Sequence, residues 1–234
     1  MNAIDAKKII ESEGYFNVIF EPATFLENRI ERKGLQEILE KSAIGLRGWN
    51  FPHISTSNRD ESVVPYSIKN GIEFFTIWGN IAEIFRFYQS GQFLAKYAVI
   101  EDRIGIWGQK NLKPREYLDF LSLIFRFTEI VLFIKNMIDV TDIDGGKIII
   151  ELHNTKDREL ESLFNSSIFS FNSDYITRMD PVIAEINFTR EKIQSDYLEL
   201  SRELVKQFFD DFNWKNYSDA MIVTHQDNLL KRRI

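Results

Sequence analysis

Aromatic-rich segments separated by turn signals occupy the middle of the chain. The segment VVPYSIK, residues 63–69, leads into Asn70-Gly71, which favours a type I′ turn because both residues tolerate positive φ. Three further strands are expected at 72–78, 81–88 and 92–100. Short turns between successive strands produce antiparallel pairing. The pattern therefore predicts a meander with the segment from Ile72 to Ile100 at the centre of a sheet.

Strand patterns also occur outside this meander. YFNVIFE at 15–21, KIIIELH at 147–153 and PVIAEI at 181–186 read as strands, which gives a sheet of about five to seven strands. Residues 154–181 are ambiguous between a polar loop and short strands, one of them SIFSFN at 167–172. A surface loop is expected at 56–62 and a short extra strand at 104–107. Alternation along 81–88 places Arg86 and Glu83 on opposite faces, so each face of that strand mixes polar and apolar side chains.

Helical periodicity marks four segments, at 3–13, 35–42, 114–138 and from Asn187 or Thr189 to about 211. The 114–138 segment is apolar on most sides, which predicts a long buried helix across the sheet. We expect one α+β domain over 1–214, in which an antiparallel sheet packs against this helix and a long C-terminal helix. Residues 215–234 are expected to form a weakly helical or mobile tail.

The composition supports a large core in a reducing compartment. The 234 residues are 44% hydrophobic and include 20 Phe but no Cys, which excludes disulfides, thiolate catalysis and Cys-ligated metals. The most apolar stretch, 117–138, contains Asp119, Arg126, Glu129 and Lys135, so a buried helix is favoured over a membrane span. The N-terminus lacks a signal-peptide pattern. We expect a cytoplasmic protein without a membrane partner.

The charge balance is acidic. The net charge is −6 and the isoelectric point is about 5.3. A general nucleic-acid binder needs clustered Lys and Arg to neutralise phosphates, so this balance argues against one. A local basic patch remains open.

One candidate binding site is the segment RGWNFPH, residues 47–53. Arg47 is a candidate anion binder, Trp49 a stacking platform, and Asn50 and His53 polar groups of a pocket rim. The alternative is structural: Trp49 and Phe51 fill the core while Arg47 pairs with a carboxylate.

A second candidate group surrounds the third turn of the meander. It comprises Glu83, Arg86, Tyr88, Gln89 and Gln92. An arginine among phenylalanines is costly to bury without a partner, so Arg86 must reach a carboxylate, a ligand or solvent. An internal salt bridge is the simpler interpretation; a polar cluster facing the 47–53 segment is the functional one.

Acidic residues near the strand at 147–153 raise the question of a metal site. Asp142, Asp144, Glu151 and His153 include potential ligands, but the strand lacks the Glu-x-Lys of a restriction-type nuclease and the turn lacks a calcium loop's downstream Glu. Phosphate-binding, dinucleotide, nucleophile-elbow and zinc-protease motifs are also absent from the sequence. We assign no metal and no cofactor.

Three motifs together resemble a widespread group of uncharacterised prokaryotic proteins. They are RGWNFPH at 47–53, RFYQSGQF at 86–93 and LHNTK at 152–156. The resemblance covers roughly residues 1–165. It implies a shared fold and a shared site, and it assigns no activity.

Three classes of function follow from these patterns. The first is a non-enzymatic binding or assembly module that acts through a protein partner or a homo-oligomer, as a subunit of a larger prokaryotic assembly. The second is a nucleic-acid-associated component of a defence or regulatory system, with Arg47, Trp49, Arg86 and the basic tail as contacts. The third is a metal-dependent hydrolase or nuclease that uses Asp144, Glu151 and His153. The first needs the fewest special residues.

Overall fold

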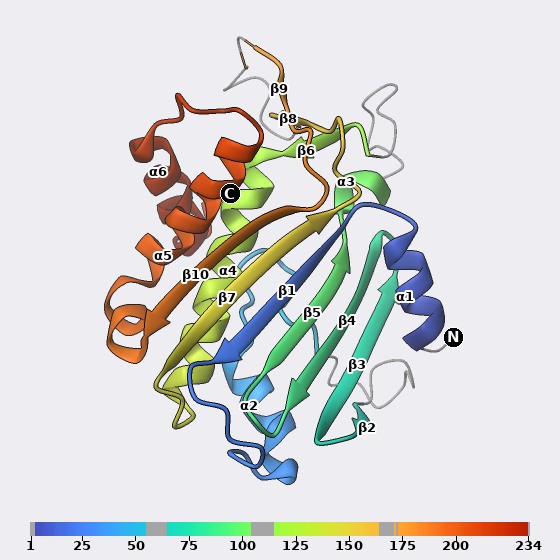
Figure 1. Cartoon of the computed structure of the whole chain (residues 1–234), viewed down its shortest axis with the longest axis vertical. Helices are drawn as coiled ribbons and strands as arrows, with labels where there is room; N and C mark the ends of the chain where they lie inside the picture. Colours follow the sequence, from blue (N-terminus) through green and yellow to red (C-terminus); the bar gives the residue numbers. More distant parts are fainter. Residues whose placement is uncertain (1–2, 55–64, 104–114, 164–170, 172, 234) are drawn as a thin grey trace.

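A seven-stranded antiparallel sheet forms the centre of the molecule (Figure 1). The computed structural model describes residues 3–54, 65–103, 115–163, 171 and 173–233. The strand order is β10-β7-β1-β5-β4-β3-β2, in which β2 to β5 form the meander expected from the sequence. These strands are β1 (Tyr15–Pro22), β2 (Tyr66–Ile68), β3 (Gly71–Trp78), β4 (Ile81–Tyr88), β5 (Phe93–Ala98), β7 (Gly145–His153) and β10 (Val182–Thr189).

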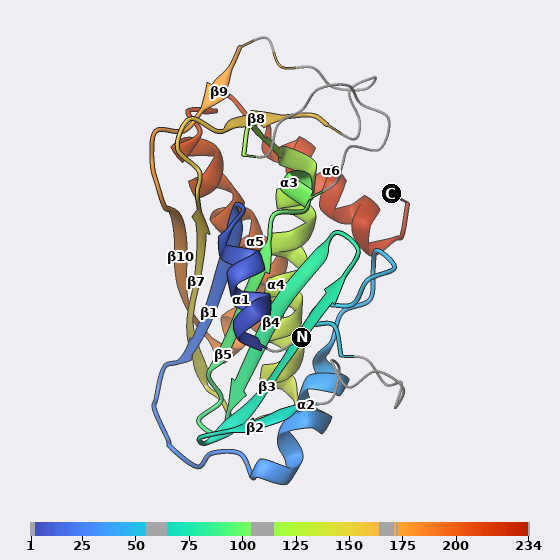
Figure 2. The same ribbon diagram turned by 90° about the vertical axis from the view of Figure 1, so that its right-hand side faces the viewer.

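Helices cover the two faces of the sheet unequally (Figures 1 and 2). The long helices α4 (Phe120–Asp139) and α5 (Arg190–Asp211) pack on one face, and α1 (Ala3–Glu11) covers β3, β4 and β5 on the other. The remaining helices are α2 (Leu35–Ser42) after the 3-10 turn η1 (Arg32–Gly34), the short α3 (Ile100–Arg103) and α6 (Asp219–Leu230). The predicted α+β fold, with its antiparallel sheet and two long packed helices, is confirmed.

Strand alternation divides the side chains between these two faces. In β1, Phe16, Val18 and Phe20 are buried in the main core with α4, while the alternate residues are only partly buried. In β4, Phe85 and Phe87 join the main core, whereas Ala82 and Ile84 pack with Ala6 and Ile10 of α1. The sequence predicted that each face of β4 carries both polar and apolar side chains, and the reason is that both faces of β4 are buried.

Helix α4 begins later than the sequence pattern suggests. Tyr117–Asp119 forms strand β6, which pairs in parallel with β8 (Glu159–Glu161) in a second, three-stranded sheet that includes β9 (Tyr175–Ile176). Asp119 then caps α4, because its Oδ2 accepts a 2.7 Å hydrogen bond from the backbone N–H of Ser122. The expected loop at 56–62 and the possible strands at 104–107 and 167–172 lie outside or largely outside the described residues.

The C-terminal segment contains a packed helix. Ile222 and Leu229 of α6 are fully buried in the main core. The buried Gln226 donates to Thr128 Oγ1 of α4 at 3.2 Å and to Ser201 Oγ of α5 at 2.6 Å. These bonds satisfy a polar group inside the helical layer and hold α6 against both long helices.

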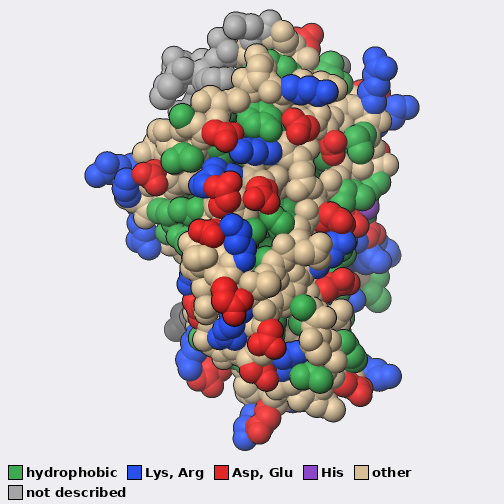
Figure 3. Space-filling view, turned by 60° about the vertical axis from the view of Figure 1, so that its left-hand side comes forward, with side chains coloured by type: hydrophobic (Ala, Val, Ile, Leu, Met, Phe, Trp, Pro, Cys, Tyr) green, Lys and Arg blue, Asp and Glu red, His purple; other side chains and the backbone are tan. Residues whose placement is uncertain are grey.

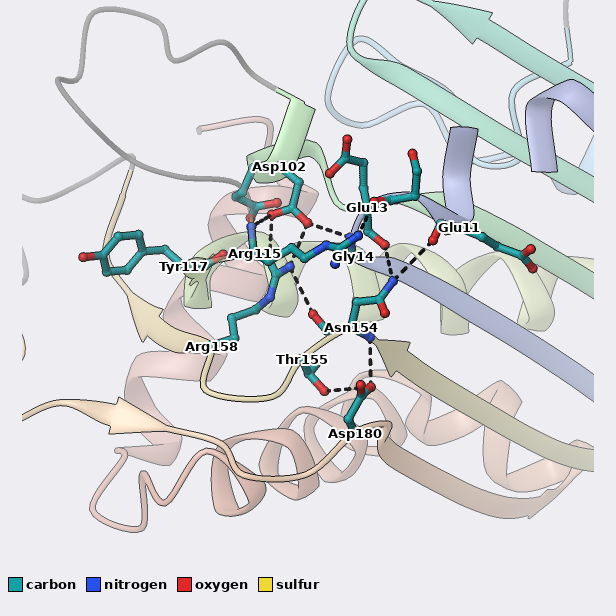
Figure 4. A network of polar contacts seen from close by, with 12 residues as sticks. Glu11, Glu13, Gly14, Asp102, Arg115, Tyr117, Asn154, Thr155, Arg158 and Asp180 are labelled. Atoms are coloured by element: carbon teal, nitrogen blue, oxygen red, sulfur yellow. Dashed lines mark hydrogen bonds and ion pairs between the residues drawn. The ribbon is translucent and has the colours of Figure 1, made fainter. Parts of the chain in front are cut away.

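A buried ion pair joins segments that are far apart in the sequence (Figure 4). The guanidinium of Arg158 donates to both carboxylate oxygens of Asp102 at 2.9 and 2.7 Å, and the two side chains are 0% and 1% exposed. Asp102 also accepts from the backbone N–H groups of Gly14 and Arg115, at 2.7 and 2.8 Å. Because Asp102 lies in α3, this junction fixes the position of the neighbouring Glu101.

Only glycine fits at position 14, because the junction leaves no space for a Cβ atom. A Cβ at this position would lie against Arg158 Nη2 and at 2.6 Å from Asp102 Oδ2, which are held by their own ion pair. We therefore expect Gly14→Ala to lower the free energy of unfolding by about 1–3 kcal/mol, the usual effect of overpacking. Urea denaturation measures this change.

Gly34→Ala is the matched control. A Cβ at Gly34 has no neighbour within 4 Å among the described residues, and its φ of −89° suits alanine. This control should be neutral or slightly stabilising, since it reduces the entropy of the unfolded chain. Equal effects of the two substitutions would contradict the role of the Asp102–Arg158 junction.

Candidate functional site

A cavity of about 170 Å³ lies between the sheet and the start of α4. Residues from the ends of β4 and β5, from α3 and α4, and from the 47–49 segment line it, and we call it the α4 cavity. Its apolar wall includes Phe16, Ile81, Val99, Leu118 and Leu123. Its polar lining includes Arg47, Glu83, Tyr97, Glu101, Ser122 and Arg126. A concave, mostly apolar site with a few converging polar groups is typical of small-molecule binding.

Helical spacing brings three polar residues of α4 to one side. Ser122, Arg126 and Glu129 are separated by four and three residues, so they share a helix face. Glu129 is buried and paired: Arg47 Nε donates to its Oε1 at 3.0 Å and Arg47 Nη2 to its Oε2 at 2.6 Å. This bidentate pair compensates both charges and anchors the 47–53 segment on α4.

Arg126 has a different environment from Arg47. Its guanidinium carbon lies 4.7 Å from the centroid of the Tyr97 ring, a cation–π contact. Within the described part of the chain, no carboxylate oxygen lies within 4.0 Å of its nitrogens and none of its N–H groups donates a hydrogen bond. Arg126 thus presents an unpaired cation to the cavity.

Two buried carboxyl groups line the same cavity. Glu83 Oε1 accepts a 3.0 Å hydrogen bond from Trp49 Nε1, and burial raises the pKa of Glu83 to about 8 against the opposing effects of Trp49 and Arg126. Burial, with the nearby Asp119 charge, raises the pKa of Glu101 to about 7. The raised pKa favours the protonated form of Glu83 at neutral pH, in which the carboxyl can donate a hydrogen bond. Perturbed carboxyl groups in a cavity are characteristic of functional sites.

Tyr97 adds a polar group without a protein partner. Its hydroxyl is buried and makes no hydrogen bond among the described residues. Burial raises the pKa of this phenol, so the group stays protonated. A buried hydroxyl without a partner is destabilising, and a ligand or water in the cavity can satisfy it.

The 47–53 segment lies at this cavity. Gly48, with a φ of +80°, lets the chain turn between Arg47 and Trp49. The Trp49 indole stacks on His53 at 3.8 Å and on Trp78 at 5.6 Å between ring centroids. Arg47 and Trp49 line the cavity, whereas Asn50 is exposed and His53 is partly buried behind Trp49.

The second predicted group, apart from Glu83, does not join the first. Arg86 lies on the opposite face of the sheet, where its Nε donates to Glu73 Oε2 at 2.6 Å, as the salt-bridge interpretation expects. Gln89 donates to the backbone oxygen of Ile30 at 3.1 Å, and Gln92 accepts from the Ser90 hydroxyl at 3.4 Å. Tyr88 adjoins Arg86 at the end of β4. A single site built from both groups is therefore wrong, because the sheet separates Arg86 from Arg47.

The sequence reasoning missed most of the polar lining. In the sequence, Arg126 and Glu129 argue only against a membrane span, and no motif marks Glu101, Tyr97 or Ser122. A signal existed in α4, where polar residues at helical spacing interrupt an apolar helix. Glu83 differs from these residues, because the sequence places it on one strand face with Phe85 and Phe87 and in the group around the third turn, and that face lines the cavity.

The potential metal ligands do not converge. Asp144 precedes β7 and Glu151 lies near its end, about 23 Å away at strand spacing. His153 Nε2 lies 3.0 Å from Glu151 Oε2, and Asn17 Nδ2 donates to the same oxygen at 2.8 Å. Within the described ranges, no group of three His, Cys, Asp or Glu side chains could hold a metal ion.

Basic side chains are distributed among acidic ones on the face that carries β10 and α5 (Figure 3). Three lysines there are paired, namely Lys147 with Glu185, Lys192 with Asp196 and Lys206 with Asp219. In the tail, Lys231 pairs with Asp227. These pairings and the Arg47–Glu129 pair engage part of the positive charge that the nucleic-acid hypothesis would use.

Comparison with known proteins gives no relative. No family model, curated protein or solved structure matches this chain. The resemblance based on the three motifs therefore stays a prediction, and function must be argued from the site. Among the described helices, none is long and apolar enough to cross a membrane.

Proposed function

We propose that this protein is a non-enzymatic binding module and that the α4 cavity binds a small amphipathic molecule. The observation that carries the proposal is the guanidinium of Arg126, which has no ion-pair or hydrogen-bond partner among the described residues and lines a cavity with apolar walls. An unpaired charge next to apolar surface is costly, so its presence favours a ligand that pairs with it. The unsatisfied hydroxyl of Tyr97 supports the same conclusion.

The chemistry of the lining favours binding over catalysis. Among the lining residues that the structure describes, Ser122 is the only aliphatic hydroxyl and no histidine accompanies it. Activation of a serine nucleophile requires an adjacent base within hydrogen-bond reach. Arg47 and Glu129 already satisfy each other. The remaining polar groups are suited to orient a ligand.

Assembly with a protein partner, expected from the sequence, stays a prediction. One observation favours it: the Trp78 side chain is 68% exposed and stacks on Trp49 beside the cavity. Tryptophan is enriched at the energetic centres of protein interfaces. A partner bound there would also contact the 47–53 segment.

Filling the cavity tests the proposed function. Ser122→Met places a longer apolar side chain in the α4 cavity and should abolish ligand binding. The probes are short-chain and aromatic carboxylates, the matching amides, amines and small sugars. A probe at about 100 times its Kd stabilises the folded state by about 2.7 kcal/mol, a rise in Tm of roughly 5–10 °C. Scanning fluorimetry measures this rise, which should be lost in Ser122→Met.

Ser195→Met is the matched control, because Ser195 is exposed on α5. This variant should retain the full ligand-induced rise in Tm. Circular dichroism and the Tm without ligand establish that both variants are folded. If no probe raises the Tm of the unmodified protein, or if Ser122→Met keeps the rise, the α4 cavity is not the ligand site.

A further inference from the structure

We infer that the ligand of the α4 cavity is a small organic monocarboxylate, with its carboxylate on Arg126 and its apolar body against Phe16, Leu118 and Leu123. This inference rests on the proposed function and specifies its ligand class. Three features carry it: a guanidinium without a partner in the described part of the chain, a limit on negative charge, and an apolar wall of matching size.

The guanidinium of Arg126 requires an anionic partner that the described protein does not supply. Both oxygens of the neighbouring Glu129 carboxylate are taken by Arg47. Tyr97 contacts the guanidinium through its ring, which stabilises the charge without accepting its N–H groups. The planar N–H donors of arginine match the two oxygens of a carboxylate.

The cavity limits the ligand to one negative charge. Glu83 and Glu101 line the same space, and a doubly charged anion would be repelled by each when it is ionised. A single carboxylate is compatible with Glu83, because burial favours its protonated form at neutral pH and the protonated carboxyl can donate to the ligand. Glu101, whose pKa burial raises to about 7, is compatible with the ligand in its protonated form. Arg47 and Glu129 compensate each other, so Arg126 supplies the one positive charge that a monoanion neutralises.

The size and the wall of the cavity favour an organic body. Cavities of about 150 Å³ lined by apolar side chains accept benzene, and the α4 cavity measures about 170 Å³. Phe16, Leu118 and Leu123 are buried members of the main core, so their exposed surface in the cavity is apolar. Burial of a short alkyl chain or an aromatic ring there adds about 25 cal/mol per Å². Inorganic phosphate gains nothing from this wall.

Protonation of Glu83 and Glu101 provides a second, measurable effect of carboxylate binding. A bound carboxylate disfavours ionisation of Glu83 and Glu101, so binding should be accompanied by proton uptake near neutral pH. The other charged groups near these side chains are Arg126 and the Arg47–Glu129 pair from the side of α4, and Asp119 and Arg158 near Glu101. Affinity for a carboxylate should therefore decrease as the pH rises from 6 to 9. A cationic ligand would show the opposite trend.

The decisive experiment compares charged and neutral probes of equal shape. Isothermal titration calorimetry with benzoate and butyrate, their amides benzamide and butyramide, and inorganic phosphate measures each Kd. Benzoate or butyrate should bind at least tenfold more tightly than its amide. Arg126→Met should remove that tenfold preference. Arg86→Met, which removes an arginine from the opposite face of the sheet, is the matched control and should keep it.

Each outcome separates the ligand class from the proposed function. Equal binding of acid and amide that is lost in Ser122→Met overturns the carboxylate class and leaves the binding module intact. Tighter binding of phosphate, or affinity that rises with pH, also overturns the class. Absence of binding by every probe in the wider panel overturns both. If Arg126→Met does not fold, the acid–amide comparison and the pH trend on the unmodified protein still decide.

Discussion

Replacement of Arg158 by methionine is expected to lower the free energy of unfolding by about 3–5 kcal/mol. The substitution removes the partner of a carboxylate that is 1% exposed and leaves Asp102 with backbone donors alone. A buried charge without its partner loses the Coulombic compensation for its desolvation. Urea denaturation followed by circular dichroism measures the loss as a lower midpoint with an unchanged m-value.

The double variant Asp102→Asn/Arg158→Met sharpens this prediction. It removes both charges, so it should be more stable than Arg158→Met alone, and the difference measures the coupling between the two residues. Lys41→Met is the control, because it breaks an exposed pair with Glu37 and should change stability by less than about 1 kcal/mol. A double variant as unstable as the single one would show that shape, rather than charge, decides stability at this junction.

Glu83→Gln is expected to stabilise the protein at alkaline pH and to leave its stability nearly unchanged at pH 5. Burial raises the pKa of Glu83 from its ordinary 4.5 to about 8. Between these values the folded protein holds a proton that the unfolded chain has lost, so the free energy of unfolding falls as the pH rises. The slope is about 1.4 kcal/mol per pH unit at its steepest, which accumulates to a few kcal/mol by pH 8–9. Glutamine does not titrate, and its amide oxygen can still accept from Trp49.

Urea denaturation at pH 5, 7 and 9 checks this dependence. Glu40→Gln is the control, since Glu40 is exposed on α2 and the variant reports the loss of one negative charge from the surface. The difference in unfolding free energy between Glu83→Gln and the unmodified protein should grow with pH beyond that of the control. A difference that is constant from pH 5 to 9 would show that Glu83 is ionised in the folded protein. It would contradict the protonated Glu83 in the α4 cavity.

Local patterns were sufficient to predict most of the sheet. The turn between β2 and β3 was predicted at Asn70-Gly71 with positive φ at both residues, but it is formed by Lys69 and Asn70: Asn70 adopts a φ of +56°, whereas Gly71 pairs with Ile68 and begins β3 without a positive φ. Period-2 alternation located β1, β3, β4 and β7 to within about two residues. The start of α4 was misplaced because β6 is defined by its pairing with β8, about forty residues further along the chain. Pairing over that separation leaves no local signature.

The candidate site was predicted only in part. Arg47 and Trp49 were identified because unusual residue types cluster at 47–53, and both line the α4 cavity. Arg86 was grouped with them by composition, but its partner is Glu73 on the opposite face. Glu83 is only three residues away from Arg86 and faces the cavity. Alternation shows that Glu83 and Arg86 lie on opposite faces of β4, but both faces carry apolar residues. The sequence therefore does not show which face packs against α4 and which against α1.

The sequence by itself determined the α+β class, the meander and the two long helices, because turn chemistry and hydrophobic periodicity act between neighbouring residues. The tertiary structure alone decided which charges are paired. Arg47 pairs with Glu129, 82 residues away, and Arg158 pairs with Asp102, 56 residues away. Arg126 has no ion-pair partner in the described part of the chain. The physical reason is that the free energy of a charge depends on its burial and on partners within a few ångströms, which only the packed fold brings together.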